Sequence, residues 1–368
     1  MAAGSEHVVP EVEGMLDRAM RLLTAPAGLR WRGVLRTLLA LGATIGVFAL
    51  LIQLLGASPW AAMKAMVTGS FGNQLNLGNT IMIASLLALT GIAAAIPFAA
   101  HLWNVGGEGQ MWFGAFVTVG VALTLPSSLP HWLFAPIVVV LAMLGGAAWG
   151  LVPGVLKAVI NANEVITSLM MTFVAIEFAN WAIDGLWPQG ASNQTANVPG
   201  NSTLPNIWPG TFVTAGAPLA VAAVVVAWVV MARTKLGFEI RAIGLNANAA
   251  RMNGMRFGKV AIVTFSLAGA FAGLAGAIYV LGIFNALSAG YSTSNFGYLG
   301  IAVALVARLN PAWIIPSALM FAFLRVGSNG LQAETALSPT IGEILVATLV
   351  VLLLAFRVIR LRYAEAAQ

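Results

Sequence analysis

Charged residues fall in narrow bands along this 368-residue chain, and long uncharged stretches separate the bands. Only 8% of the residues are Asp, Glu, Lys or Arg, while 60% are hydrophobic. A soluble domain of this size needs ionic groups over its whole surface, whereas a bilayer removes that need for the part it covers. The chain is therefore predicted to be a polytopic membrane protein. The uncharged stretches are residues 37–63, 65–100, 110–156, 185–232 and 260–307.

Apolar segments predict an all-α transmembrane bundle of about eight to ten helices, because a helix needs roughly 20 apolar residues to cross the hydrocarbon. The eighth and ninth segments are short and are separated by Asn310-Pro311, which breaks a helix. They form either a kinked hairpin or one broken helix. The ten segments are 35–56, 79–100, 109–125, 132–152, 165–185, 213–232, 260–284, 297–308, 312–327 and 341–358.

The distribution of Lys and Arg predicts how the spans are oriented. If the N-terminus is cytoplasmic and ten spans follow, every Lys and Arg except Lys64 and Arg325 falls on the cytoplasmic side, as the positive-inside rule requires. Both termini are then cytoplasmic. The predicted parts are an N-terminal tail at 1–34, a transmembrane domain at 35–358 and a C-terminal tail at 359–368. That domain contains an outer loop at 186–212 and a basic cytoplasmic loop at 233–259.

The N-terminal tail does not resemble a signal peptide, because several charged residues precede any apolar run. Its residues 11–23 form either an amphipathic helix on the membrane surface or part of a disordered tail.

The residue types exclude several kinds of chemistry. The chain has no Cys and only three scattered His, so a metal centre is not expected. The stretch that begins at Gly254 is one residue short of a phosphate-binding loop and lacks its hydroxyl residue. Basic residues at one membrane face also give no nucleic-acid signal. A transporter of this sequence must therefore take its energy from a partner or from an ion gradient.

Among the carboxylates near apolar segments, Glu177 is the one predicted to lie deep in the membrane, since Asp184 and Glu343 fall near segment ends. A charge at mid-bilayer costs about 2.5–3.5 kcal/mol on insertion scales. Glu177 either has a function, such as proton relay, or lines a polar interface. So few intramembrane carboxylates argue against a proton-coupled carrier.

A glycine-rich segment at 101–110 has two interpretations. Three glycines in four positions disfavour a helix, and unwound backbone beside a helix start is where transporters bind polar solutes. The alternative is a tight cytoplasmic turn in which Glu108 caps the following helix.

Two further patterns have structural interpretations. Asn163 is predicted to cap a helix, with Glu164 in its first turn, although a contact with a partner is also open to this cytoplasmic segment. Gly269, Gly273 and Gly276 have the small-residue spacing of close helix packing.

Several blocks, taken in order, resemble bacterial ATP-binding-cassette (ABC) importer permeases for nucleosides, within the branched-chain amino acid and simple-sugar permease family. The first block is Asn104-Val-Gly-Gly-Glu108-Gly-Gln110, and the similarity extends over about residues 40–358. Two positions depart from the family pattern: Trp103 stands where Phe is usual, and Met252 where Tyr is common. The other blocks are Asn163–Met171, Arg241–Met255, Ser266–Gly276 and Gly300–Ala307.

The resemblance implies a vitamin B12 importer-like or ribose importer-like bundle in the bacterial cytoplasmic membrane, with two permease chains per complex that are often different. An extracytoplasmic binding protein delivers the solute, and separate ATPase chains hold the ATP and magnesium, so this chain carries no cofactor and is not an enzyme. Residues assigned to the coupling loop are Arg241, Gly244, Asn246, Ala249, Ala250, Arg251 and Gly254. Residues assigned to the translocation path or gate are Asn104, Glu108, Gln110, Asn163, Glu164 and Glu177.

The resemblance points to nucleosides of the guanosine or uridine type as the transported solute. A simple-sugar permease, for ribose or galactosides, is the main alternative. An ion-coupled secondary carrier using Glu177 is a weaker reading, and a channel is weaker still because the chain has no ring of charges or filter-like motif.

Overall fold

A computed structural model describes residues 42–335, except 44, 127, 191 and 290–293, together with scattered residues between 340 and 352. The chain divides into two compact units, one formed by Met66–Gly330 and the other by Met1–Ala65 with Leu331–Gln368. The predicted terminal tails, the beginning of the first predicted span and most of the last one lie outside the described residues.

Two helices at the start of the described chain meet at a sharp bend that the sequence reading did not predict. The helix Ile45–Leu54 and α3 (Pro59–Phe71) are inclined by 116°. Gly56 ends the first helix with a φ of +78°, a conformation that glycine adopts readily. Pro59 then occupies the first position of α3, where the missing amide costs nothing. The region between the first two predicted spans, residues 57–78, is therefore largely helical.

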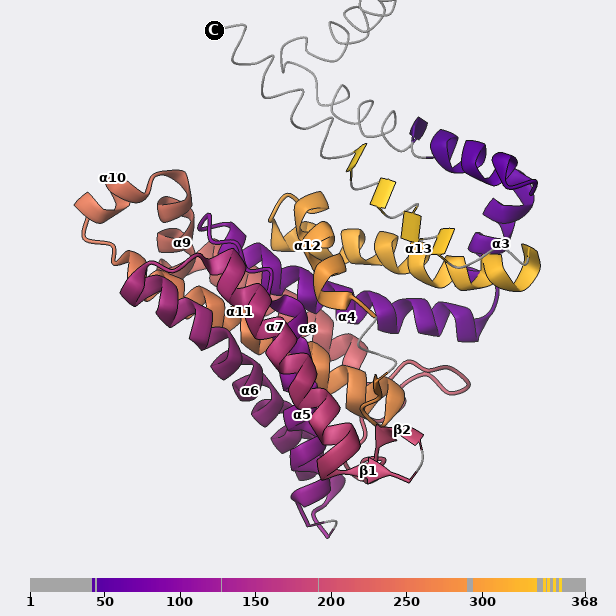
Figure 1. Ribbon diagram of the computed structural model, residues 1–368, viewed down its shortest axis with the longest axis horizontal. Coiled ribbons are helices and arrows are strands. Elements are labelled where there is room, and N and C mark those ends of the chain that lie inside the picture. Colours follow the sequence, from indigo (N-terminus) through magenta and orange to yellow (C-terminus); the bar gives the residue numbers. More distant parts are fainter. Residues whose placement is uncertain are drawn as a thin grey trace, which may run out of the picture. The chain divides into compact units, whose positions relative to one another are not determined.

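The two most buried of the span-length helices form the centre of the larger unit. These are α4 (Gln74–Phe98) and α11 (Phe257–Tyr279), and α11 packs against α4, α5 (Gly107–Thr124) and α6 (His131–Ile160). Both are apolar on all sides, as expected of helices enclosed by other helices. Figure 1 shows α11 running between α6 and α4.

The remaining helices match the predicted spans closely. They are α7 (Glu164–Trp181) with the π-helical turn η1 (Ala182–Leu186), α8 (Gly216–Arg233), the turn η2 (Val280–Phe284) after α11, α12 (Phe296–Val306), the 3₁₀ turn η4 (Pro311–Trp313) and α13 (Ile314–Thr335). The break at Asn310-Pro311 is confirmed, because α12 ends before it and Asn310 caps η4.

The predicted all-α polytopic bundle is confirmed, but its helices are not all full spans. Among the described residues, six helices are long and apolar enough to cross a membrane, or seven if the bent pair is one span. The predicted eighth span corresponds to α12, which has only 11 residues. At 1.5 Å per residue it covers roughly half of the hydrocarbon thickness.

Close helix packing through glycine is confirmed at the predicted positions. A Cβ added to Gly269 would lie 2.0 Å from the Gly146 carbonyl oxygen on α6, and one added to Gly273 would lie 2.4 Å from that of Ala142. Gly276 meets the Met111 carbonyl oxygen of α5 in the same way, at 2.3 Å. The series therefore brings the backbone of α11 directly against α5 and α6.

The predicted outer loop at 186–212 contains a small antiparallel hairpin that the all-helical prediction omits. Its strands are β1 (Pro188–Gln189) and β2 (Ser192–Thr195). The Thr195 amide donates to the Leu287 carbonyl, and the Leu204 amide donates to the Leu281 carbonyl. The loop is thus fixed along the segment that follows α11.

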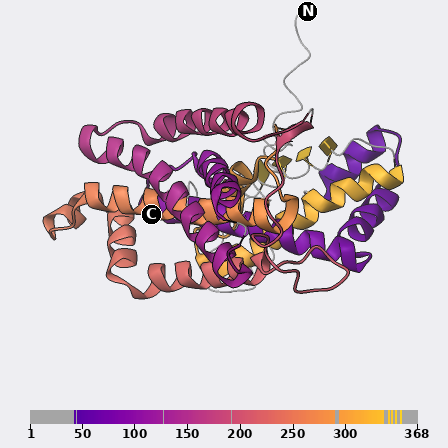
Figure 2. The same ribbon diagram turned by 90° about the horizontal axis from the view of Figure 1, so that it is seen from below.

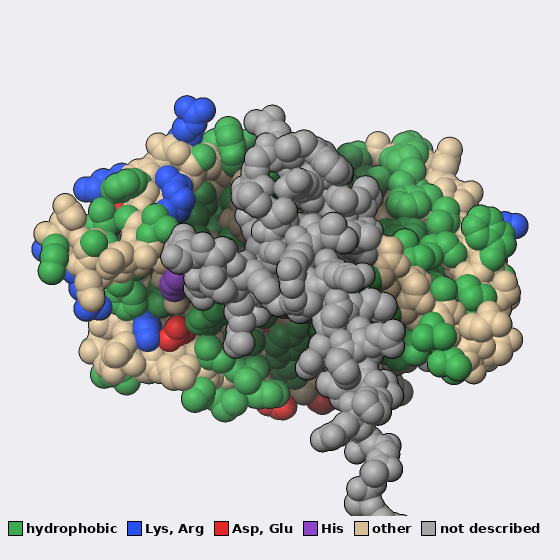
Figure 3. Space-filling view, turned by 90° about the horizontal axis from the view of Figure 1, so that it is seen from above, with side chains coloured by type: hydrophobic (Ala, Val, Ile, Leu, Met, Phe, Trp, Pro, Cys, Tyr) green, Lys and Arg blue, Asp and Glu red, His purple; other side chains and the backbone are tan. Residues whose placement is uncertain are grey.

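The larger unit carries different structures at the two ends of α7 and α11. Two short helices, α9 (Lys235–Leu245) and α10 (Ala247–Met252), lie where α8 ends and α11 begins, and they project beyond the neighbouring helices (Figure 2). The β1–β2 hairpin lies at the opposite end (Figure 1). Figure 3 shows Lys and Arg side chains gathered on the side of α9 and α10.

Candidate functional site

The glycine-rich segment leads into a buried polar cluster at the start of α5. Asn104 donates through Nδ2 to the Gln110 side-chain oxygen at 3.0 Å and to the Ala93 carbonyl at 3.4 Å. Its Oδ1 accepts from the Gly106 amide at 3.1 Å. Both amide side chains are buried. Asn104 and Gln110, both predicted as path residues, therefore bond to each other and join α4 to α5.

Glu108 lies beside them and is only 1% exposed. One carboxylate oxygen accepts from the Trp112 indole at 2.9 Å, and the other accepts from the Gly297 amide. Gly297 is the second residue of α12. The carboxylate therefore satisfies an amide at the N-terminus of α12, where the helix dipole also favours a negative charge. This corrects the interpretation of Glu108 as a cap for its own helix.

Arg325 of α13 lies against Phe296, the first residue of α12. Its guanidinium lies 4.7 Å from the centre of the Phe296 ring, and its side chain is half-buried. The charge bands assigned Glu108 and Arg325 to opposite water-facing sides. Because α12 is short, its N-terminus instead lies where both groups can reach it.

The glycines of this segment allow close packing. A Cβ on Gly106 would lie 2.7 Å from the Ser168 carbonyl oxygen, and one on Gly109 would lie 2.5 Å from the Cα of Thr172. The Ser168 hydroxyl in turn accepts from the Val105 amide at 3.2 Å. The amides of Val105 and Gly106 are therefore satisfied within the chain, which favours a packed junction over an open solute site here. We name Asn104, Glu108, Gln110, Ser168 and Gly297 the polar junction.

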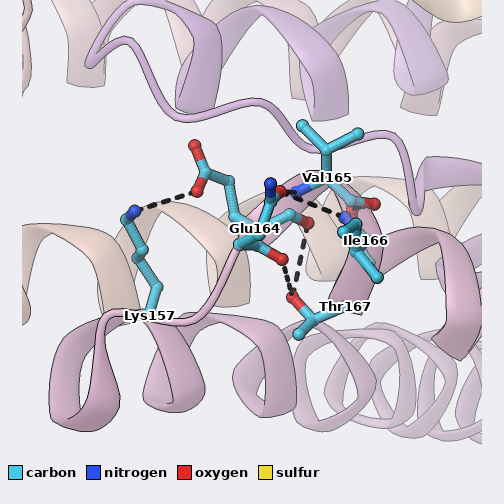
Figure 4. A network of polar contacts seen from close by, with 7 residues as sticks. Lys157, Glu164, Val165, Ile166 and Thr167 are labelled. Carbon is cyan, nitrogen blue, oxygen red and sulfur yellow. Dashed lines mark hydrogen bonds and ion pairs between the residues drawn. The ribbon is translucent and has the colours of Figure 1, made fainter.

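Asn163 caps α7 and Glu164 is the first residue of that helix, so both lie outside the polar junction. Glu164 faces Lys157 near the end of α6 (Figure 4). The Asn163 side chain accepts from the amides of Val165 at 3.0 Å and Ile166 at 3.3 Å, which confirms the predicted cap. Glu164 forms an ion pair with Lys157 at 3.0 Å. This pair bridges the tight turn between the two helices, which Asn161 makes with a φ of +50°.

Glu177 lies on α7 and is exposed, unlike Glu108. Its carboxylate accepts one long hydrogen bond, 3.5 Å, from Asn180 one turn further along the helix. Within the part of the chain that the structure describes, no Lys or Arg forms an ion pair with it. The structure thus places Glu177 apart from the other predicted path residues.

The predicted coupling loop forms a compact helical pair. Thr234 caps α9 by accepting from the Gly237 amide at 3.2 Å, and Asn246 caps α10 by accepting from the amides of Asn248 and Ala249 at 3.1 and 3.0 Å. The predicted residue Gly254 has a φ of +79° and turns the chain into α11. Local capping therefore explains the polar residues at these positions.

One predicted residue connects this pair to the rest of the bundle. Gly244 is buried, and a Cβ placed on it would lie 2.0 Å from the Ala99 carbonyl oxygen. Ala99 directly follows α4 and begins the segment that leads to the polar junction. Ala250 is also buried, whereas Arg241, Asn246, Ala249 and Arg251 are exposed. The guanidinium of Arg251 lies 5.3 Å from the Phe257 ring centre.

The sequence reading missed two apolar side chains at the projecting tip. Leu245 is 88% exposed and Met252 is 90% exposed. Their exposure depends on how α9 packs against α4 and α8, so helical periodicity alone did not reveal it. Large apolar groups exposed to this degree in a projecting element are typical of interaction surfaces.

These features define a class: a polytopic helical membrane protein with a polar junction inside its bundle and a basic helical pair at one end. Comparison with known families identifies the family within this class. Residues 76–356 match the family described as branched-chain amino acid transport system / permease component, and the chain belongs to that family.

The chain is similar to several characterised permeases along most of its length. It is 34% identical to the glucose ABC transporter permease of Haloferax volcanii, over 90% of this chain and 89% of that protein. It is 30% identical to the guanosine ABC transporter permease of Bacillus subtilis, over 84% and 89%. It is 28% identical to a nucleoside ABC transporter permease of Lactococcus lactis, over 87% and 90%. No solved structure gave a significant match.

Proposed function

We propose that this chain is a membrane subunit of an ABC importer that translocates nucleosides. Family membership and the presence of nucleoside permeases among its relatives support this assignment. So does the block around Glu108, on which the resemblance to nucleoside permeases first rests. The absence of a phosphate-binding loop from the sequence fits a subunit whose ATP and magnesium are held by separate ATPase chains.

The observation that carries the mechanism is the projecting α9–α10 pair. It presents Leu245 and Met252 to solvent on the basic end of the bundle, and its own turns are closed by capping. A short, capped helix with an exposed apolar tip suits an ATPase that must bind it and push it without unfolding it. The positive-inside rule places this end in the cytoplasm, where ATP is available.

Close packing transmits a displacement of α9 to the helices inside the membrane. The Gly244–Ala99 contact joins α9 to the segment that follows α4, and that segment leads to Asn104 and Glu108. Glu108 then bonds α5 to the start of α12. Because packed backbones do not deform continuously, displacement of α9 moves α5 and α12 together. The polar junction thereby acts as a joint between helices that open and close the path.

The remaining assignments follow from this orientation. Both termini lie in the cytoplasm, and the chain resides in the bacterial cytoplasmic membrane together with a second permease chain. The outer face is the end that carries β1–β2, where an extracytoplasmic binding protein delivers the solute. The hairpin's backbone bonds to the segment after α11 give that protein a fixed surface to dock on.

Sugar transport is the second candidate function, because the relative with 34% identity is a glucose permease. A nucleoside and a hexose share a hydroxylated ring, so either solute suits a path with few polar groups. Comparing uptake of guanosine and of glucose by the same complex decides between them.

Proteoliposomes containing both permease chains, the ATPase and the binding protein test the assignment. ATP-dependent guanosine uptake is expected, and Leu245→Asp or Met252→Asp should reduce it by about tenfold or more, because each places a charge in an apolar contact. Asn248→Ala is the matched control, since Asn248 is exposed on the same helical pair. Gly244→Pro is less informative because it also disturbs packing on Ala99.

Uptake against a gradient by this chain alone would contradict the proposal. Uptake that a protonophore abolishes, with no ATPase present, would instead support an ion-coupled carrier.

A further inference from the structure

One face of α7 carries an acidic side chain between two aromatic ones. Phe173, Glu177 and Trp181 follow one another at intervals of four residues, which places them along one side of a helix. Both aromatic side chains are 53% exposed, and Glu177 is exposed as well. No described part of the chain covers this stripe, which we name the α7 stripe.

The stripe lies inside the hydrocarbon if α7 spans the membrane. The segment Glu164–Leu186 is long and apolar enough to do so. Glu177 lies about 20 Å along the helix from Glu164 and roughly 13 Å before Leu186. With a hydrocarbon thickness of about 30 Å, neither end of the segment brings its carboxylate into bulk water.

A carboxylate at that depth is not expected to face lipid. Exposing it to hydrocarbon costs about 2.5–3.5 kcal/mol even on the most lenient scale. Glu177 receives no compensating ion pair from the described residues, and its bond from Asn180 is long. The α7 stripe must therefore face either water or another protein chain.

The side of α7 next to the stripe is held by aromatic contacts, so the stripe has a fixed direction. The Phe178 ring packs edge-on against Phe113 of α5 and Trp149 of α6, with centroid distances of 5.7 Å in both cases. Phe113 and Trp149 are themselves stacked at 4.1 Å. Trp181 lies at the edge of this cluster, 6.2 Å from Phe178. Rotation of α7 that would hide Glu177 would break these contacts.

The chemistry of the stripe fits one kind of ligand. A carboxylate accepts hydrogen bonds from neighbouring hydroxyl groups, and aromatic faces on either side stack on flat rings or on the apolar face of a sugar. We propose that the α7 stripe lines the translocation path and binds the hydroxylated ring of the transported solute, with Glu177 accepting from its hydroxyls. This inference rests on the proposed function and adds to it the ring hydroxyls as the recognised group.

The chain contains no cysteine, which allows a direct test by single-cysteine labelling. Phe173→Cys, Glu177→Cys and Trp181→Cys are placed separately in the assembled transporter, with Leu144→Cys as control. Leu144 is an exposed apolar residue of α6. A membrane-impermeant, charged thiol reagent should modify the three stripe positions and leave Leu144→Cys unmodified.

Protection by solute identifies what binds. Guanosine should slow modification of Phe173→Cys, which keeps the Glu177 carboxylate, by about tenfold at saturation, whereas 2′,3′-dideoxyguanosine should protect much less because it lacks the ring hydroxyls. Protection by glucose and not by guanosine would support recognition of ring hydroxyls, and it would identify the solute as a sugar and not a nucleoside. Equal protection by guanosine and its dideoxy analogue would overturn hydroxyl recognition.

Two outcomes separate this inference from the proposed function. If ATP-driven guanosine uptake by the native complex is intact but the stripe positions do not react, the stripe is covered by lipid or protein and only the inference fails. Glu177→Gln gives a check that does not depend on labelling. The ratio of guanosine uptake to dideoxyguanosine uptake should fall by roughly tenfold in this variant. An unchanged preference would count against Glu177 as the hydroxyl acceptor.

Discussion

Glu108 and Glu177 are two carboxylates within apolar parts of the same bundle, and the structure treats them in opposite ways. Glu108 is buried and receives hydrogen bonds from Trp112 and from the Gly297 amide. Glu177 is exposed on the α7 stripe with one long bond from Asn180. The first is supplied with partners by its own chain, while the second leaves its acceptor capacity open.

This contrast assigns a structural role to Glu108 and a solute-binding role to Glu177. A buried carboxylate that accepts a hydrogen bond from a second helix holds the two helices in a fixed relation, and its burial keeps a solute away from its remaining lone pairs. An exposed carboxylate with free lone pairs has the opposite properties. Stability measurements should therefore report on Glu108, and transport measurements on Glu177.

Removing the Glu108 carboxylate should have the largest effect on stability. Glu108→Leu leaves the Trp112 indole and the Gly297 amide buried without an acceptor. We expect a loss of about 3 kcal/mol in the free energy of unfolding, measured by thermal or denaturant unfolding of the detergent-solubilised chain.

Glu108→Gln is the matched control, because its side-chain oxygen still accepts one of the two bonds. It should lose about half as much. Equal stability of the Leu variant and the native chain would show that the polar junction does not hold α5 and α12 together.

The Glu164–Lys157 pair should show an intermediate effect. Both side chains are only partly exposed, and the pair spans a turn that Asn163 already stabilises by capping. Glu164→Gln should therefore cost about 0.5–1 kcal/mol of unfolding free energy. Lys157→Met should cost about the same, and the double variant little more than either alone. Fully additive losses would show that the two groups act independently.

Local and short-range features were predictable from sequence. The cap at Asn163, the break at Asn310-Pro311 and the packing of Gly269 and Gly273 depend on residues whose neighbours in the chain, or whose spacing on one helix, fix the outcome. Hydrophobic stretches long enough for a span likewise predicted the helices that surround α11. In each case one physical cause acts over a few helical turns.

Contacts between distant residues were not predictable. Glu108 and the Gly297 amide are 189 positions apart, and no periodicity connects them. Since α12 is short, charge bands that assume full spans assigned Glu108 and Arg325 to opposite sides. Likewise, the exposure of Leu245 depends on the Gly244–Ala99 contact, which is a property of the folded chain.

Changing Glu177 should have the smallest effect on stability and a large effect on transport. Because its carboxylate is exposed and held by one long bond, Glu177→Leu should shift the melting temperature of the detergent-solubilised chain by less than about 2 °C. Removing the acceptor that we assign to the solute's hydroxyls should nevertheless reduce ATP-driven guanosine uptake by about tenfold, measured in proteoliposomes with matched protein content. Leu144→Ala, which changes an exposed apolar residue of α6, should alter neither quantity. If Glu177→Leu lowered the melting temperature as much as Glu108→Leu, both carboxylates would be structural, and the contrast between them would fail.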